Sequence, residues 1–163
     1  MPKMTDLSKG MIFFCFCGIL LSYYAYIVET KKEEDENYEA MCDISEHMSC
    51  SKAFSSRFGK GFGVIGSVLG ENSVLNQPNS IYGILFYSIV GVLATLESAA
   101  ASRILFWVCL FSNLASIYLA YILAFILHDF CVVCISTYIV NAVITFLAYF
   151  RFKRHVSQHV KAN

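Results

Sequence analysis

Two cysteines separated by two residues, Cys131 and Cys134, lie in the sequence FCVVC within a strongly apolar run. A C-x-x-C pair can alternate between dithiol and disulfide, and in a soluble βαβ setting it would indicate a thioredoxin-like redox site. Here the next charged residue after Asp129 is Arg151, so the pair stands at the start of a hydrophobic helix. We therefore expect its chemistry to take place at a membrane.

Two further cysteines, Cys42 and Cys50, lie eight positions apart in MCDISEHMSC. Structural disulfides would suit this loop pair but not the helix pair, because cysteines one helical turn apart close a strained, easily reduced bridge. A four-cysteine zinc site would have an unusual spacing. In a relay, the loop pair would carry electrons between a soluble partner and the helix pair. Three other cysteines are expected to act as small buried hydrophobes: Cys15, Cys17 and Cys109.

The elements that must position these residues are four uncharged segments of 18 to 24 residues, at 10–28, 79–96, 104–127 and 130–150. About 20 apolar residues cross the hydrocarbon layer as a helix, and lipid admits only structures that satisfy their own backbone. The sequence therefore predicts an all-α integral membrane protein, a single membrane domain over residues 1–163 built as a four-transmembrane-helix bundle. The first segment is longer than the apolar core of a signal peptide, so we expect it to be retained.

Lysine and arginine are distributed unequally about these segments. With four spans both termini share one side, and the short segments of that side carry Lys3, Lys9, Arg103, Arg151, Lys153, Arg154 and Lys161. The positive-inside rule then predicts cytosolic termini and a luminal or exterior loop at 29–78. The 12 basic and 12 acidic residues balance, which gives no basic surface for nucleic acid.

The large outer loop, 29–78, begins with the charge run ETKKEEDENYEA, which predicts a solvated helical extension of the first span. An apolar patch at 62–69, in a glycine-flexed stretch, is expected to form a short cap or interfacial helix. Pro78 disfavours a helical residue before it and can start a helix after it. Asn79 is therefore expected at the outer end of the second span.

The second and fourth spans both begin at the outer face, which brings Asn79 towards the C-x-x-C pair. On a helix, Cys131, Cys134 and Tyr138 share one face, with Asn141 one turn deeper. The first sulfur is expected to face exchange partners and the second to face the bundle interior. A dithiol that opens into an apolar bundle suits a lipid-soluble acceptor, most commonly a quinone. Asn79 and Tyr138 are of the right type to stabilise charge that develops on its oxygens.

Four segments, MCDISEHMSC, FSSRFGKGFG, SVLNQPNSIYG and HDFCVVCISTY, resemble in sequence and order the vertebrate form of the vitamin K epoxide reductase family. The likeness covers roughly residues 10–150, and NQPNS and GSVLG look more like a paralogue than the principal enzyme of the family. The resemblance implies a multi-pass enzyme of the endoplasmic reticulum membrane, with cytosolic termini and an active site facing the lumen. Such an enzyme reduces vitamin K 2,3-epoxide to the quinone and the quinone to the hydroquinone.

The resemblance also implies residue roles: Cys131 and Cys134 as the catalytic pair, Cys42 and Cys50 as the electron relay, Asn79 and Tyr138 as donors to substrate oxygens, and Phe54, Tyr82, Phe86, Leu119 and Leu123 as pocket residues. In this scheme Cys134 meets the substrate and Cys50 exchanges with Cys131. The implied partners are a luminal thioredoxin-fold oxidoreductase, membrane lipid and 4-hydroxycoumarin anticoagulants. A small external dithiol would replace the protein reductant, and neither a metal nor a permanently bound cofactor is implied.

Two positions depart from the pattern of the family, Phe58 in place of tryptophan and Tyr82 in place of phenylalanine, and both bear on inhibitor affinity. Two other functions stay open on the residues alone. A quinone-linked oxidase of the same fold would form disulfides in partners with the same residues, because the potential of the partner sets the direction. A non-enzymatic four-span scaffold would hold structural disulfides and an inert thiol pair.

Overall fold

A computed structural model describes residues 4–45 and 48–162 of the chain. Its helices are α1 (Asp6–Glu34), α2 (Cys50–Ser55), the 3-10 turn η1 (Gly61–Gly63), α3 (Ile65–Leu69), α4 (Asn79–Thr95), α5 (Ala99–Phe125) and α6 (Val132–Ala162). Within the described residues, extended pairing is limited to two isolated bridges, Ser45–Met48 and Lys60–Pro78. The predicted all-helical fold is therefore confirmed.

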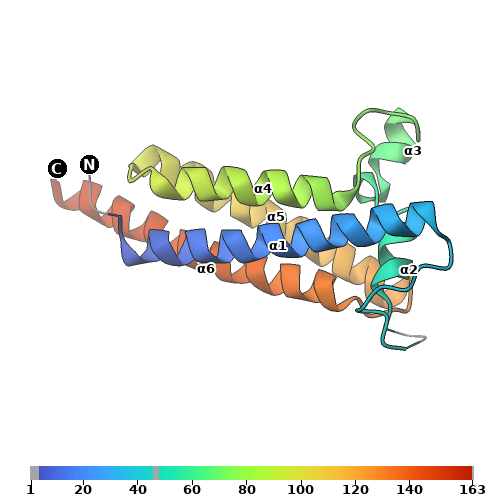
Figure 1. The fold of residues 1–163 in the computed structure, drawn as a ribbon. Helices are drawn as coiled ribbons and strands as arrows, with labels where there is room; N and C mark the ends of the chain where they lie inside the picture. The colour runs from blue at the N-terminus through green and yellow to red at the C-terminus, as the bar shows by residue number, and fades with distance from the viewer. Residues whose placement is uncertain (1–3, 46–47, 163) are drawn as a thin grey trace.

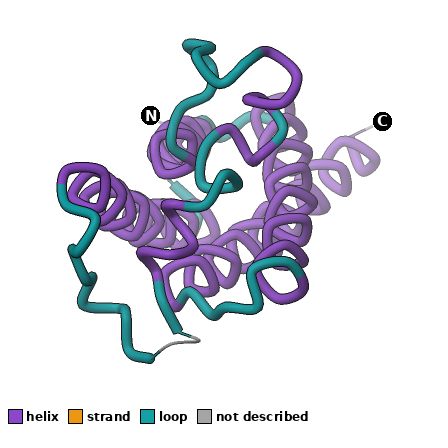
Figure 2. The backbone as a smooth tube through the Cα atoms, turned by 90° about the vertical axis from the view of Figure 1, so that its right-hand side faces the viewer, coloured by secondary structure: helices purple, strands orange, loops and turns teal. Residues whose placement is uncertain are grey.

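The four long helices, α1, α4, α5 and α6, run alongside one another as a bundle (Figure 1). Both termini lie at one end of the bundle, and α2, α3 and their connecting loops lie at the other, here called the outer end, where they cover the helix ends (Figures 1 and 2). Helix α1 packs most extensively against α4 and α6, and α5 packs against α6. Of these contacts between long helices, the one between α4 and α5 is the smallest.

Among the described residues, three helices are long and apolar enough to cross a membrane: α1, α5 and residues Val132–His155 of α6. Helix α4, with 17 residues, is shorter and spans about 26 Å at 1.5 Å per residue. The outward faces of the bundle carry large apolar side chains, such as Phe13, Phe111 and Phe146, each more than 60% exposed. Soluble proteins rarely expose contiguous apolar surface of this kind, so the fold fits a membrane protein.

The helix boundaries follow local signals in the sequence. Thr5 and Ser98 cap α1 and α5, because each side-chain oxygen accepts a hydrogen bond from a backbone N–H of the first turn. Pro78 stands immediately before α4, so Asn79 opens that helix as predicted. The charge run does extend α1 beyond the apolar segment, but only as far as Glu34, after which the chain turns into the outer loop.

Two glycines allow α1 and α4 to approach closely. A Cβ atom on Gly18 would lie 2.5 Å from the ring of Tyr87, and one on Gly83 would lie 2.5 Å from Ser22 Oγ. Real Cβ atoms essentially never show separations this short, so a larger residue at either position would require the Tyr87 ring, the Ser22 side chain or the helices themselves to shift. This close contact brings the outer half of α4 against α1.

The core between the helices contains two of the three cysteines that bear no disulfide. Cys15 and Cys109 are buried in one apolar cluster that also includes Tyr87, Leu105 and Ile144. This environment agrees with their expected role as small hydrophobes. Cys17 is also a free thiol but lies only partly buried, on a different face of α1.

A polar cluster closes the end of the bundle that holds the termini. Arg151 of α6 is 1% exposed, and its guanidinium donates to Ser102 Oγ (3.1 Å) and to the carbonyl oxygen of Ala94 (2.7 Å). Glu97 lies 3.8 Å from the guanidinium and accepts a hydrogen bond of 2.7 Å from Ser8 Oγ. The cluster therefore ties α1, the α4–α5 turn, α5 and α6 together.

Candidate active site

The loop cysteines form a disulfide at the outer end of the bundle. Cys42 is bonded to Cys50, which is the first residue of α2. The side chain of Cys50 is completely buried. The hydroxyl of Tyr24 in α1 lies 3.7 Å from Cys42 Sγ. The loop pair is thus held against the bundle and does not project into solvent.

Asp43, next to Cys42, organises the chain around this disulfide. Its carboxylate accepts hydrogen bonds from the backbone N–H and side chain of Ser51, from Ala40 N (2.8 Å) and from Ser49 Oγ (2.8 Å). Partial burial raises the pKa of Asp43, but these hydrogen bonds outweigh it and lower the pKa to about 2. The carboxylate is therefore ionised at neutral pH and keeps the loop closed around its disulfide.

The helix cysteines are also disulfide-bonded. Cys131 stands immediately before α6, not inside its first turn as the sequence analysis expected, and its Sγ accepts a hydrogen bond from Cys134 N (3.1 Å). Asp129, just upstream, accepts hydrogen bonds from Phe130 N (2.8 Å) and from Ser49 N (3.2 Å). Asp129 therefore joins the start of α6 to the start of α2, the two elements that carry the cysteine pairs.

The two disulfides meet in one buried cluster. Cys50 and Cys131 are both fully buried in it, together with Ala25 and Leu123, and their partner cysteines pack against it. The loop pair and the helix pair thus share one apolar environment. Such an arrangement suits thiol–disulfide exchange between the pairs.

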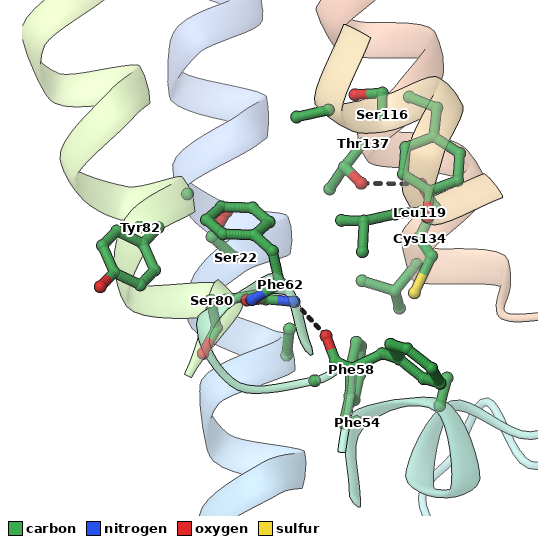
Figure 3. A pocket seen from close by; sticks show the side chains of 18 of the residues that line it. Ser22, Phe54, Phe58, Phe62, Ser80, Tyr82, Ser116, Leu119, Cys134 and Thr137 are labelled. Carbon is green, nitrogen blue, oxygen red and sulfur yellow. Dashed lines mark hydrogen bonds between the residues drawn. The ribbon is translucent and has the colours of Figure 1, made fainter. Parts of the chain in front are cut away.

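A cavity of about 250 Å³ lies inside the outer half of the bundle and beneath the segment 53–62, with walls from α1, α4, α5 and α6. Figure 3 shows the Cys134 sulfur on the same side as Leu119, across from Ser22, Ser80 and Phe62. The walls are mostly apolar. Eight of the residues predicted from the sequence line this cavity: Phe54, Asn79, Tyr82, Phe86, Leu119, Leu123, Cys134 and Tyr138. The other three, Cys42, Cys50 and Cys131, lie outside it.

The side chain of Asn79 joins the roof of the cavity to α4. Its Oδ1 accepts a hydrogen bond from Phe62 N (2.9 Å), and its Nδ2 donates to the carbonyl oxygen of Phe58 (2.6 Å, Figure 3). Phe62 has a left-handed backbone (φ 57°), which is costly for a bulky residue, and Gly61 and Gly63 beside it also have positive φ. Asn79 therefore stabilises a strained turn and retains one amide hydrogen that these bonds do not use.

The inner part of the cavity is lined by hydroxyl and amide groups. Tyr87 donates a hydrogen bond of 2.8 Å to Asn141 Oδ1, and Asn141 Nδ2 donates one of 2.9 Å to Ser116 Oγ. Tyr138, one turn nearer the outer end of α6, also lines the cavity. Of the helical stripe predicted from Cys131 through Cys134 and Tyr138 to Asn141, the last three residues lie on the cavity wall and Cys131 does not.

One charged residue that the sequence analysis did not single out also lines the cavity. Glu29 of α1 is 4% exposed, and its Oε2 accepts a hydrogen bond from Ser80 Oγ (3.2 Å). Glu29 is the first residue of the charge run, and it was therefore expected to be solvated like the charged residues that follow it. Its spacing from Ser22 and Ala25, seven and four positions along one helix face, was the available signal.

The arrangement can transfer two electrons to an apolar molecule. A dithiol at the positions of Cys131 and Cys134 would present one sulfur to the cavity, whose walls would exclude water from a reactive adduct. Among residues 4–45 and 48–162 there is no group of three or more His, Cys, Asp or Glu side chains that could hold a metal ion. The groups available for chemistry at the cavity are therefore thiols, hydroxyls, amides and one carboxyl.

Comparison with known proteins identifies a family for the chain. The model of the vitamin K epoxide reductase family matches residues 10–149. The chain is 46% identical over 141 residues to vitamin K epoxide reductase complex subunit 1 of Mus musculus, an alignment that covers 86% of this chain and 88% of the mouse protein. It is 45% identical over 141 residues, with the same coverage, to the protein of that name from Rattus norvegicus.

Proposed function

Because the chain belongs to the vitamin K epoxide reductase family, we propose that it reduces vitamin K 2,3-epoxide and vitamin K quinone with the Cys131–Cys134 dithiol as electron donor. The family is one of oxidoreductases, which fixes the class of chemistry. The observation that carries the proposal is the position of Cys134, which belongs to a disulfide and also lines an apolar cavity inside the bundle. A fused aromatic quinone needs such apolar walls together with a few hydrogen-bond donors.

In the proposed reaction, the Cys134 thiolate attacks the bound epoxide or quinone. The free amide hydrogen of Asn79 and the hydroxyl of Tyr138 stabilise the negative charge that develops on the substrate oxygens. Cys131 then attacks the sulfur of the adduct, which releases the reduced product and leaves the Cys131–Cys134 disulfide. Both electrons of the dithiol pass to the substrate in this step.

The loop pair restores the dithiol in this scheme. Cys50 attacks Cys131 and releases Cys134 as a thiolate. Cys42 then attacks Cys50, which releases Cys131 and forms the Cys42–Cys50 bridge, and a thioredoxin-fold partner reduces this bridge. The burial of Cys50 and Cys131 in one cluster supports this exchange. Both disulfides are formed in the structure, which corresponds to the fully oxidised protein that the partner would reduce.

The proposal includes the location of the enzyme. Helix α4 would cross the membrane together with α1, α5 and α6, so both termini would share one side. The basic residues of that side favour the cytosol, and the covered end of the cavity would then face the lumen of the endoplasmic reticulum. Helix α4 has 17 residues, which is long enough to cross a locally thinned bilayer. Anticoagulants of the 4-hydroxycoumarin type would bind the same cavity, against Phe54, Tyr82 and Leu119.

The test is vitamin K quinone reduction by the purified protein with a small dithiol as reductant. Because a small dithiol can reduce the helix pair directly, we expect Cys134→Ala to be inactive and Cys42→Ala to keep most of the parent activity. Cys17→Ala, at a free thiol outside the cavity, is the matched control and should equal the parent. Full turnover by Cys134→Ala would remove the thiol from the chemistry and favour a scaffold with structural disulfides.

A further inference from the structure

Glu29 is a buried carboxyl group on the wall of the cavity. Its Oε2 accepts the hydrogen bond from Ser80, whereas its Oε1 is buried and has no hydrogen-bond partner within the described part of the chain. Buried polar atoms are almost always paired, and each exception requires an explanation, of which a catalytic role is one. Ser80 follows Asn79, so this carboxyl lies at the end of the cavity where Asn79 is held.

The charges around Glu29 do not neutralise it directly. Lys60 of the cap and Glu33, one turn further along α1, both act on it, but Lys60 forms its ion pair with Glu33 and not with Glu29. The other titratable side chains around the cavity are Tyr82 and Tyr87 of α4 and Cys134 and Tyr138 of α6. An ionised carboxylate with a single hydrogen bond is costly at this depth, whereas the neutral acid carries an O–H that can donate.

The proposed reaction leaves one proton without a source. Reduction of a quinone to a hydroquinone, or of an epoxide to a quinone and water, takes up two electrons and two protons. Formation of the disulfide releases both electrons, and the Cys131 thiol releases one proton when it attacks the adduct. Since Cys134 reacts as a thiolate, it brings no proton, and a second acid must supply the other.

We propose that Glu29 is this acid and that it donates its proton to the substrate oxygen bound at the Asn79 end of the cavity. The inference rests on the proposed function and adds a catalytic residue to it. The complete step converts quinone, Cys134 thiolate, Cys131 thiol and protonated Glu29 into hydroquinone, disulfide and ionised Glu29, with one negative charge on each side. The carboxylate then regains a proton from water at the outer face, where Lys60 and Glu33 are about half exposed.

The test compares turnover numbers of the parent, Glu29→Gln and Glu29→Asp for quinone reduction by a small dithiol, over the pH range in which the parent is stable. Glutamine keeps the size and the acceptor for Ser80 but has no acidic proton. Glu34→Gln is the matched control, because it removes a like charge from the exposed end of α1, outside the cavity, and Glu34 is not among the charges that act on Glu29. The quantity to plot is the ratio of parent to variant turnover, in which the titration of the cysteine thiols cancels.

General acids contribute about 100-fold or more, so the ratio for Glu29→Gln should reach about 100 at low pH. It should fall towards one as pH rises, because the parent then loses the acid form that the variant never has. Glu29→Asp should keep a pH-dependent rate, and the ratio for Glu34→Gln should stay near one. A ratio for Glu29→Gln that is near one, or high but independent of pH, would overturn the proposal and leave Glu29 a structural residue.

Two further outcomes separate a failure of the proposed function from a failure of the role assigned to Glu29. A parent that does not reduce quinone at all would defeat the proposed function and not this assignment specifically. Should Glu29→Gln fail to fold, infrared difference spectra of a single turnover by the parent decide the question. Loss and recovery of a protonated carboxyl band is expected, and its absence would contradict the proposal.

Discussion

At the scale of single residues, Asn79 has two tasks that are usually separate. Its carbonyl and one amide hydrogen hold the backbone of Phe62 and Phe58, and its own backbone N–H donates to the carbonyl oxygen of Gly59 (2.8 Å). The roof of the cavity is therefore fixed by the same side chain that is proposed to donate to the substrate. A donor that is already held in place loses little freedom when substrate binds, which favours preorganised stabilisation of charge.

We expect Asn79→Asp to lower the turnover number for quinone reduction by about 100-fold or more and to raise KM. Aspartate can still accept from Phe62 N, but it cannot donate to Phe58 or to a substrate oxygen, and it places a negative charge where negative charge develops. Steady-state kinetics with a small dithiol measures both constants.

The matched control for this variant is Gln77→Ala, which removes an exposed side-chain hydrogen bond to the carbonyl oxygen of Val74 in the same loop and should leave both constants unchanged. A rise in KM with an unchanged turnover number for Asn79→Asp would show that Asn79 only holds the roof.

At the scale of the helices, the two ends of the bundle are held by different means. The outer end relies on two disulfides and the hydrogen bonds of Asp43 and Asp129, whereas the end with the termini relies on Arg151 and Glu97. Partial burial raises the pKa of Glu97, but the hydrogen bonds from Thr5 and Ser8 and the charge of Arg151 together lower it below its ordinary value. The inner cluster is therefore charged and stable while the outer pairs exchange.

Arg151→Ala should destabilise the bundle by about 3–5 kcal/mol, because it leaves Glu97 buried beside an unfilled space and unpairs the carbonyl oxygen of Ala94. The measurement is the free energy of unfolding in detergent. Arg154→Ala, which removes an exposed arginine one turn away, should change it by less than about 0.5 kcal/mol. Because the cluster lies far from the cavity, folded Arg151→Ala should turn over quinone like the parent; equal stability of both variants would contradict this account.

Much of this arrangement can be derived from local sequence patterns. Uncharged segments predict the long helices, Pro78 predicts the start of α4, and the spacing of Cys134 and Tyr138 predicts one wall of the cavity. The remainder depends on contacts between distant segments. The bonds from Asn79 to residues 17 and 21 positions earlier have no local signature, and the burial of Glu29 arises only because α4 packs over it. Cys131 lies off the cavity because it precedes α6 and does not belong to its first turn.

At the scale of the whole molecule, the apolar surface forms a belt between two polar ends. Helix α4 takes part in this belt, since Leu85, Ile89 and Val92 on its outward face are about half exposed or more. Charged residues concentrate at the two ends: the termini and Arg103 at one, and Lys31, Lys32 and Glu33 at the other. This pattern is expected if all four long helices cross the membrane, including the one that is shortest.

The topology can be tested directly with sealed microsomes. Both termini lie at one end of the bundle and the loop 29–78 lies at the other (Figure 1). Epitope tags at the two termini should therefore have the same sensitivity to added protease, and a tag in the loop should have the opposite sensitivity. The exposed turn at Glu71 is a suitable insertion site, since it lies away from the cavity. Protease added outside should remove both terminal tags and spare the loop tag until detergent opens the vesicles. If the two terminal tags differed in their sensitivity, α4 would not cross the bilayer, and the cavity would have to open on the cytosolic side or within the membrane, where a luminal reductant could not reach Cys42.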